Sequence, residues 1–160
     1  MPLSSKIIPS PVGALTLVAN DRALVAVLWE RENPARVRLG ETVACRDHPL
    51  LCLAAAQLGE YFAGDRRHFD LPLAFHGTDF QRATWQELLK IPYGETRSYA
   101  ALATALGRPG AARAVGAANA RNPISIIAPC HRVIGANGAL TGFAGGLAAK
   151  QALLALERAG

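Results

Sequence analysis

The sequence lacks the marks of a membrane or secreted protein. Its 160 residues contain no uncharged apolar run of about 18 residues, which a membrane-spanning helix would need. The first residues do not form a basic segment followed by an apolar stretch, so they carry no recognisable secretory signal. We therefore expect a protein of the cytoplasm that does not bind a membrane.

Cysteine is also scarce. The three cysteines, Cys45, Cys52 and Cys130, are an odd number at wide spacings, which does not indicate a disulfide framework and favours a reducing compartment. Cys45 and Cys52 flank His48, but this spacing matches no compact zinc pattern. Because Cys52 lies in an apolar, helix-like run, we interpret it as a buried structural cysteine and expect no metal site there.

Acidic residues are nearly absent from the second half of the chain. Residues 81–160 carry nine basic and three acidic side chains, whereas residues 1–80 carry eight and nine. No carboxylate side chain lies between Glu95 and Glu157, an interval that holds five arginines and one lysine. A one-signed segment of this length indicates a polyanionic partner, most often a nucleic acid. A basic protein with an uneven surface would show the same pattern.

The chain does contain enough apolar side chains for a folded core, since hydrophobic residues make up 51% and charged residues 18% of it. Strand-like runs at residues 13–19 and 23–29 are separated by turn residues, which predicts a hairpin. Residues 7–8 fit a third strand, and residues 48–63 fit a helix with one apolar face. Residues 69–73 fit an edge strand that ends this lobe.

The second half of the chain carries helix signals. Thr78 and Gln81 form a capping-box pattern, which predicts a helix that continues to about residue 90. Two short helices at residues 99–106 and 111–120 are joined by a Gly-Arg-Pro-Gly corner. They have the outline of a helix-turn-helix, a shape that other helical bundles share.

Together these patterns predict an α+β fold in two parts. Residues 1–77 would form a small N-terminal α/β lobe with an antiparallel sheet, which we interpret as a scaffold domain. Residues 78–160 would form a mostly helical C-terminal domain that contains the helix-turn-helix. Because the excess of positive charge lies in the second part, we expect it to bind the polyanion.

The predicted helix at residues 111–120 consists almost entirely of small side chains, with Arg113 near its start and Asn119 near its end. Small side chains allow a helix backbone to approach another helix or a DNA groove closely. A fully buried helix would need a partner for Arg113, so an exposed helix fits better. Because the helix lacks long polar side chains that read base edges, we expect contact with DNA to be independent of sequence.

The most informative segment is residues 122–134, an apolar run that we expect to be extended and that contains a Pro-Cys-His-Arg motif. Pro129 stiffens the approach to Cys130, and the neighbouring His131 and Arg132 provide an electropositive environment that favours the thiolate. Adjacent residues of an extended chain point in opposite directions, so proton exchange between Cys130 and His131 would need a bridging water or a bend. A buried structural cysteine beside a surface His-Arg pair is the alternative.

This segment and its surroundings closely resemble the O6-alkylguanine-DNA alkyltransferases, also called methylated-DNA–protein-cysteine methyltransferases. The resemblance is greatest to the bacterial constitutive, single-function members and covers roughly half of the chain, from Phe80 to Glu157. The N-terminal lobe resembles theirs only in outline. The matching motifs are Asn122-Pro123, the Ile-Ala-Pro-Cys-His-Arg-Val-Ile run ending at Ile134, Gly138, Thr-Gly-Phe-Ala-Gly-Gly at residues 141–146, and Arg-Ala-Val-Gly at residues 113–116.

The resemblance implies direct repair of O6-alkylguanine, and of O4-alkylthymine, in double-stranded DNA by irreversible, single-turnover transfer of the alkyl group to Cys130. It implies that His131, oriented by Glu157, acts on Cys130 through water, that Asn122 braces the segment, and that Tyr99 helps to rotate the nucleotide and donates a hydrogen bond to the base. The small-residue helix would enter the minor groove. The implied DNA- and base-binding residues are Arg113 (which would fill the vacated stack), Tyr99, Ala114, Gly116, Arg132, Val133, Phe143, Ala144, Gly145 and Lys150.

Elementary chemistry agrees with these implied roles. Attack at a saturated carbon needs a good nucleophile and a proton for the leaving oxygen, which a thiolate and Tyr99 would provide without a metal or cofactor. The O6 atom is inaccessible inside the base stack, so the nucleotide must be flipped out. A thioether product offers no carbonyl for water to attack, so one molecule would repair one lesion. We expect a monomer and leave open whether it binds DNA cooperatively.

Two features depart from the family pattern. Phe143 stands where many relatives have tyrosine, so any contact made by the phenol hydroxyl is lost, and Cys45, His48 and Cys52 do not reproduce the N-terminal zinc ligands of the human relative. Three other functions share parts of the pattern. An alkyltransferase-like protein would lack the cysteine, a thiol hydrolase would leave the basic half unexplained, and a helix-turn-helix regulator would need longer base-reading side chains.

Overall fold

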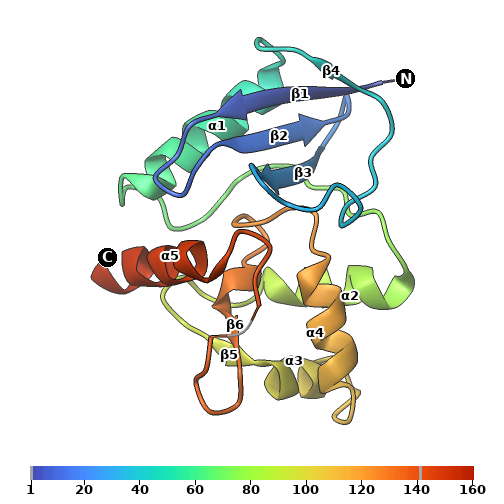
Figure 1. Ribbon diagram of the computed structural model, residues 1–160, viewed down its shortest axis with the longest axis vertical. Coiled ribbons are helices and arrows are strands. Elements are labelled where there is room, and N and C mark those ends of the chain that lie inside the picture. Colours follow the sequence, from blue (N-terminus) through green and yellow to red (C-terminus); the bar gives the residue numbers. More distant parts are fainter. Residues whose placement is uncertain (1, 141) are drawn as a thin grey trace.

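The computed structural model describes residues 2–140 and 142–160 of the chain, and Thr141 of the family motif lies outside these residues. The N-terminal residues form a sheet covered by a helix, and most of the C-terminal helices lie beneath it (Figure 1). This is the predicted α+β fold. No helix within the described ranges is long and apolar enough to cross a membrane.

Four strands form the N-terminal sheet in the order β3-β2-β1-β4 (Figure 1). β1 (Leu3–Ile8), β2 (Leu15–Ala19) and β3 (Leu24–Trp29) are antiparallel neighbours, which confirms the predicted hairpin and the strand before it. β4 (Thr42–Ala44) pairs with β1 in parallel. The sheet is therefore antiparallel except at this one edge.

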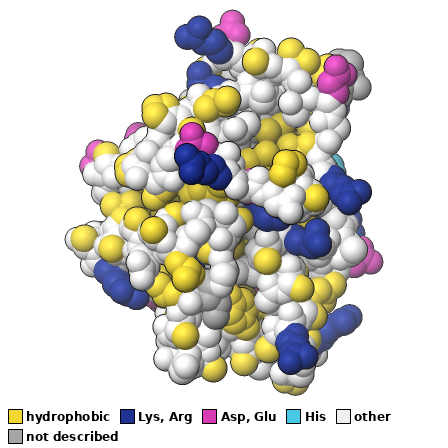
Figure 2. Space-filling view, in the orientation of Figure 1, with side chains coloured by type: hydrophobic (Ala, Val, Ile, Leu, Met, Phe, Trp, Pro, Cys, Tyr) yellow, Lys and Arg dark blue, Asp and Glu magenta, His cyan; other side chains and the backbone are white. Residues whose placement is uncertain are grey.

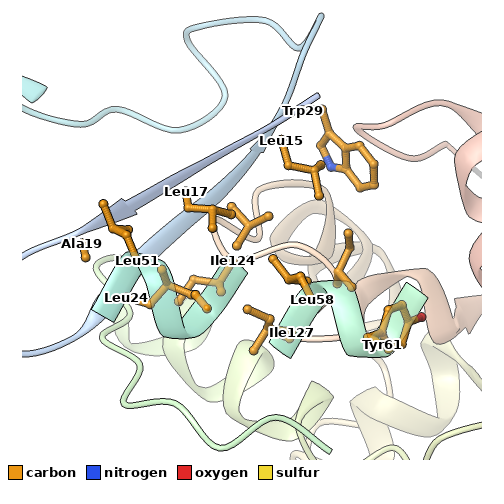
Figure 3. Close-up of a cluster of buried hydrophobic side chains, with 14 of the residues drawn as sticks. Leu15, Leu17, Ala19, Leu24, Trp29, Leu51, Leu58, Tyr61, Ile124 and Ile127 are labelled. Atoms are coloured by element: carbon orange, nitrogen blue, oxygen red, sulfur yellow. The ribbon is translucent and has the colours of Figure 1, made fainter. Parts of the chain in front are cut away.

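Helix α1 (Pro49–Phe62) packs on one face of this sheet (Figure 1). The imidazole of His48 caps it by accepting a hydrogen bond from Leu50 N at 3.2 Å, and Pro49 occupies the first turn, where a missing N–H is tolerated. The side chains on its inner face join the main core of the protein. Figure 3 shows Leu51, Leu58 and Tyr61 of α1 with Leu15, Leu17, Leu24, Ile124 and Ile127.

Two expectations for the N-terminal lobe are wrong. Residues 69–73 do not form an edge strand, since Leu73 makes only an isolated bridge to Leu24 and Pro72 has no amide hydrogen with which to extend a ladder. Cys52 is exposed rather than buried, and its Sγ donates to the carbonyl of Arg46 at 3.3 Å. Adjacent helical residues are turned about 100° from each other, so the position after the buried Leu51 faces solvent.

The described residues of the C-terminal lobe form four α-helices, and the predicted caps begin two of them. Thr78 Oγ1 accepts from Gln81 N at 3.1 Å while the Gln81 side chain accepts from Thr78 N at 3.0 Å, which completes the capping box. Ser98 Oγ accepts from Ala101 N at 3.0 Å. The helices are α2 (Asp79–Leu88), α3 (Tyr99–Ala105), α4 (Ala112–Ala120) and α5 (Leu147–Ala159), of which α5 has no predicted counterpart.

The segment at residues 122–134 is not a continuous extended run. A 3₁₀ turn, η1 (Cys130–Arg132), interrupts it, and β6 (Val133–Ile134) then pairs in parallel with β5 (Arg97–Ser98). Residues 124–128 are buried in the core of the N-terminal lobe, where Val27 N donates to the carbonyl of Pro123 at 2.9 Å. The chain leading to the cysteine is therefore held by both lobes.

Candidate active site

Cys130 is the first residue of the short 3₁₀ turn η1. The carbonyl of Pro129 accepts a hydrogen bond from Arg132 N at 3.0 Å and closes the turn. This turn is the bend that proton exchange between Cys130 and its neighbour His131 requires, because the alternation of an extended strand is broken here. Cys130 is only 4% exposed, so a substrate must enter a pocket to reach it.

Asn122 braces the backbone that leads to this turn. Its fully buried side chain donates from Nδ2 to the carbonyl of Ala128 at 2.8 Å and accepts at Oδ1 from Ile124 N at 3.1 Å. Between these contacts Ile127 N donates to the carbonyl of Ser125 at 2.8 Å, and Ile126 in the middle of the tight turn has a φ of +73°. A β-branched residue rarely adopts this conformation, so the surrounding bonds hold a strained, rigid support for the cysteine.

Burial raises the pKa of the Cys130 thiol, and hydrogen bonds from the side chains of Asn122 and Ser125 oppose this effect. Trp29 Nε1 donates to Ser125 Oγ at 3.1 Å, which leaves the Ser125 hydrogen for the sulfur. The resting group is therefore a thiol. This corrects the expectation of a thiolate favoured by the flanking basic residues, because the side chains of both turn toward Glu157.

The imidazole of His131 is fully buried, and its Nε2 lies 2.7 Å from Oε2 of Glu157. Burial lowers the pKa of His131, although the hydrogen bond to Glu157 opposes the shift. The ionised carboxylate only accepts, so Nε2 carries the proton and Nδ1 of the neutral ring is an acceptor. Within the described residues Nδ1 has no hydrogen-bond partner. A neutral histidine with a free acceptor nitrogen is suited to act as a general base.

Glu157 receives hydrogen bonds from both lobes. Tyr61 Oη donates to its Oε2 at 2.6 Å, while Arg132 donates from Nε to Oε1 at 2.8 Å and from Nη2 to Oε2 at 3.0 Å. Burial alone would raise the pKa of Glu157, but the hydrogen bonds from His131 and Arg132 lower it to about 2. The carboxylate therefore stays ionised near neutral pH and fixes the orientation of the imidazole.

Arg132 and Lys150, which the resemblance implies as DNA- or base-binding residues, are buried, and Lys150 Nζ lies 5.9 Å from the centroid of the Phe143 ring. Arg132 is 6% exposed and donates from Nη1 to the carbonyl of Ile91 at 2.6 Å, in addition to its two bonds to the Glu157 carboxylate. Lys150 is fully buried and donates from Nζ to the carbonyl of Val133 at 2.7 Å. Both cations therefore hold the cysteine turn and the strand after it from within.

Helix α4 presents the surface that the sequence predicts. Arg113 and Ala114 are exposed, whereas Val115 and Ala118 on the opposite side are buried. Asn119 Nδ2 donates to the carbonyl of Cys130 at 3.4 Å, so this helix also contacts the cysteine turn. Figure 2 shows several Lys and Arg side chains and few acidic ones on this face of the helical lobe.

Of the remaining predicted residues, Tyr99 and Phe143 pack against the buried cluster that contains Cys130. Tyr99, at the start of α3, is half-buried, and a Cβ added to Gly116 would lie 3.7 Å from its ring. The Phe143 ring packs edge-on against Trp29 with centroids 5.3 Å apart. A Cβ on Gly145 would lie 2.6 Å from the Trp29 ring, so only glycine fits there. Phe143 and Ala144 line a cavity of about 470 Å³ with Gly142, Asn33, Ala35, Arg36, Ala117, Ala120 and Arg121.

Sequence reasoning missed the N-terminal residues that reach this site. Tyr61 contacts Glu157, Trp29 contacts Ser125, and Arg36 donates from Nη1 to the carbonyl of Asn122 at 2.7 Å. These pairs are separated by 86 to 96 positions in the chain, so no local spacing marks them. Within the part of the chain that the structure describes, no group of three or more His, Cys, Asp or Glu side chains is placed to hold a metal ion.

Comparison with known proteins gives matches along nearly the whole chain. Residues 4–75 match the ribonuclease-like domain of 6-O-methylguanine DNA methyltransferase, and residues 79–159 match its DNA binding domain. A methylated-DNA–protein-cysteine methyltransferase of Mycolicibacterium paratuberculosis is 51% identical over 151 residues, covering 94% of this chain and 90% of the relative. A constitutive enzyme of that description from Bacillus subtilis is 48% identical, covering 93% and 92%.

Solved structures agree with these matches. The crystal structure of Mycobacterium tuberculosis OGT in complex with DNA is similar, with a TM-score of 0.91 and 46% identity. The match covers 98% of this chain and 93% of that one. A structure of the O6-methylguanine methyltransferase from the same organism gives a TM-score of 0.86 at 47% identity, with the same coverage.

Proposed function

The chain belongs to the 6-O-methylguanine DNA methyltransferase family and is a DNA-repair methyltransferase of the methylated-DNA–protein-cysteine type; from this premise we propose that Cys130 accepts the alkyl group from O6 of guanine, or O4 of thymine, in one irreversible transfer. The observation that carries this proposal is the placement of Cys130 in a turn next to the buried His131–Glu157 pair. That pair supplies a base to a thiol that burial keeps protonated.

The chemical step uses these residues and one water molecule. A water beside Nδ1 of His131 passes the thiol proton to the imidazole, and Glu157 stabilises the imidazolium that forms. The Cys130 sulfur then attacks the alkyl carbon, so the sulfur–carbon bond forms as the carbon–oxygen bond to guanine breaks. Tyr99 donates its phenolic proton to the leaving guanine, which departs as the neutral base, and the imidazolium proton returns through solvent to the phenolate, so that His131 and Tyr99 regain their starting states. The product is a thioether, which water does not hydrolyse under these conditions, and the protein is spent.

Helix α4 provides the DNA contact in this proposal. Its exposed, small side chains allow it to enter the minor groove without reading base edges, and Arg113 projects into the stack in place of the flipped nucleotide. The extruded base enters the site bounded by Phe143, Ala144 and Gly145. The contacts are independent of sequence. Affinity should therefore fall with salt concentration and depend little on the surrounding bases.

The two parts of the chain divide this work. We propose residues 1–77 as the domain that supports the site and residues 78–160 as the DNA-binding and alkyl-acceptor domain. The site is complete within one chain, since Cys130, His131 and Glu157 all come from it. This supports a monomer as the repairing species, acting on double-stranded DNA that contains O6-alkylguanine.

Label transfer tests this proposal. The protein is incubated with excess duplex DNA that carries O6-methylguanine with a radioactive methyl group. We expect label to move to protein until one methyl is bound per molecule, and to stay on DNA with Cys130→Ser. Cys45→Ser, which changes a cysteine of the other lobe, is the matched control and should transfer normally. Label released as a small molecule, or continued turnover, would contradict the proposal.

A further inference from the structure

Tyr61 brings a side chain of the N-terminal lobe into direct contact with the acid–base pair. It lies on α1, is fully buried, and donates to Glu157 Oε2 at 2.6 Å across 96 positions of sequence. Figure 3 shows its oxygen at the edge of the apolar cluster, pointing away from the leucine side chains. His131 Nε2 bonds to this same carboxylate oxygen at 2.7 Å. Arg132 Nη2 also donates to this oxygen, at 3.0 Å. The phenol, the imidazole and the guanidinium therefore share one acceptor atom.

We propose that Tyr61 is a positioning residue that sets, through Glu157, how readily His131 takes up the proton from Cys130. This inference rests on the proposed function, because it assigns a partner to the base of that reaction. It also gives the N-terminal lobe a part in the chemistry beyond that of a scaffold.

The direction of the effect follows from the sharing of Oε2. Each donor to a carboxylate oxygen draws negative charge toward itself and weakens the bonds of the other donors to that atom. Tyr61 therefore limits how strongly Glu157 stabilises a protonated His131. Burial raises the pKa of Tyr61 far above its usual value, and the neighbouring Glu157 adds to this effect. The phenol thus keeps its hydrogen and remains a donor at every pH at which the protein works.

The charged and titratable groups around Glu157 come from several elements. Besides Tyr61 on α1, they are His131 and Arg132 of η1 and, acting on the imidazole, Lys150 of α5. Tyr93 also packs here, with its ring centroid 6.2 Å from that of Tyr61 and 5.7 Å from the Arg132 guanidinium. Arg132 donates to Glu157 and Lys150 donates to the carbonyl of Val133, and neither bond involves the phenol oxygen. Removing that oxygen therefore leaves the net charge of the cluster unchanged and alters only the sharing of Oε2.

The test is Tyr61→Phe, which deletes one oxygen and keeps the ring. The first measurement is the pH dependence of alkyl transfer from free O6-benzylguanine, a substrate that avoids any change in DNA binding. The second is the titration of the His131 ring by NMR, which needs no activity. We expect the His131 pKa and the acidic limb of the rate to rise by about one unit, because a hydrogen bond to a charged group is worth roughly tenfold in equilibrium.

Gln57→Met is the matched control. Gln57 lies one turn before Tyr61 on α1, is 4% exposed, and exchanges two hydrogen bonds with the backbone of Asp70, at 3.0 and 2.9 Å. Its replacement should lower stability by an amount similar to that of Tyr61→Phe and leave the pKa of His131 unchanged. A merely structural role for Tyr61 would make the two variants behave alike.

A second arm keeps the phenol in place. Incorporating 3-fluorotyrosine at the three tyrosines makes each a stronger donor, so the His131 titration should move down in pH, and this movement should be absent from Tyr61→Phe. An unchanged or opposite titration in either arm overturns the inference. Failure of the wild-type protein to alkylate Cys130 would instead refute the proposed function, because the NMR titration does not depend on it.

Discussion

Replacement of Glu157 by glutamine tests how the site is held together. The change removes the charge that Arg132 faces through bonds of 2.8 and 3.0 Å, and Glu157 and Arg132 are 3% and 6% exposed. Removing one member of a buried ion pair leaves the other uncompensated and costs about 3–5 kcal/mol. We therefore expect Glu157→Gln to lower the free energy of unfolding at pH 7 by about that amount, measured by urea denaturation.

The pKa of Glu157 gives a second, independent value for the stability that Glu157→Gln should lose. The pKa of Glu157 is lowered from 4.5 to about 2 by the hydrogen bonds that outweigh its burial, which corresponds to about 3 kcal/mol of stability. A carboxyl with a lowered pKa contributes this stability above pH 4.5 and loses it as the pH falls toward 2. The difference in free energy of unfolding between the wild type and Glu157→Gln should therefore be largest at pH 7 and nearly absent near pH 2.

Two further variants make this prediction refutable. Arg132→Met alone should also be strongly destabilising, whereas the double variant Glu157→Gln with Arg132→Met should recover much of the loss, because neither charge is then left unpaired. A loss below about 1 kcal/mol for Glu157→Gln, typical of an exposed pair, would show that the buried network is not what supports the turn. So would a loss that does not change with pH.

Three other predictions concern Arg113, Ser125 and Gly145. Arg113→Ala should slow repair of duplex DNA far more than reaction with free O6-benzylguanine, and equal losses would contradict the stacking role. Ser125→Ala leaves the Trp29 N–H without its acceptor, so we expect the free energy of unfolding in urea to fall by about 1–3 kcal/mol. Alkyl transfer should be slower at pH 7 and recover in alkaline buffer, and a rate loss independent of pH would argue against a hydrogen bond to sulfur. Gly145→Ala would bring a Cβ to 2.6 Å from the Trp29 ring, so we expect a lower melting temperature. An unchanged melting temperature would show that the loop moves away without cost.

Local signals in the sequence were enough to predict much of the fold. The capping box of Thr78 and the Ser98 cap depend on residues three positions apart, and both are present. The small-residue helix α4 is exposed at Arg113, as its composition predicts. The prediction of an edge strand at residues 69–73 was wrong because β propensity does not tell whether a neighbouring strand is free to pair.

The arrangement around Glu157 could not be predicted in this way. Tyr61 contacts it across 96 positions and Arg132 across 25, and such pairs leave no periodic signal in a single sequence. An arginine beside a reactive cysteine in a basic lobe is naturally assigned to DNA, and only the folded chain shows its guanidinium turned inward to a carboxylate. The thiol state of Cys130 depends on burial, which the flanking sequence does not reveal.

The measurement that tests the account most directly is a map of where the alkyl group ends up. The protein is treated with excess duplex DNA containing O6-methylguanine, digested, and examined by peptide mass spectrometry. We predict one added methyl group on Cys130 and none on Cys45 or Cys52, although Cys52 is exposed and Cys130 is buried. Methylation of the more exposed cysteines, or methyl loss from DNA with Cys130 unmodified, would contradict it.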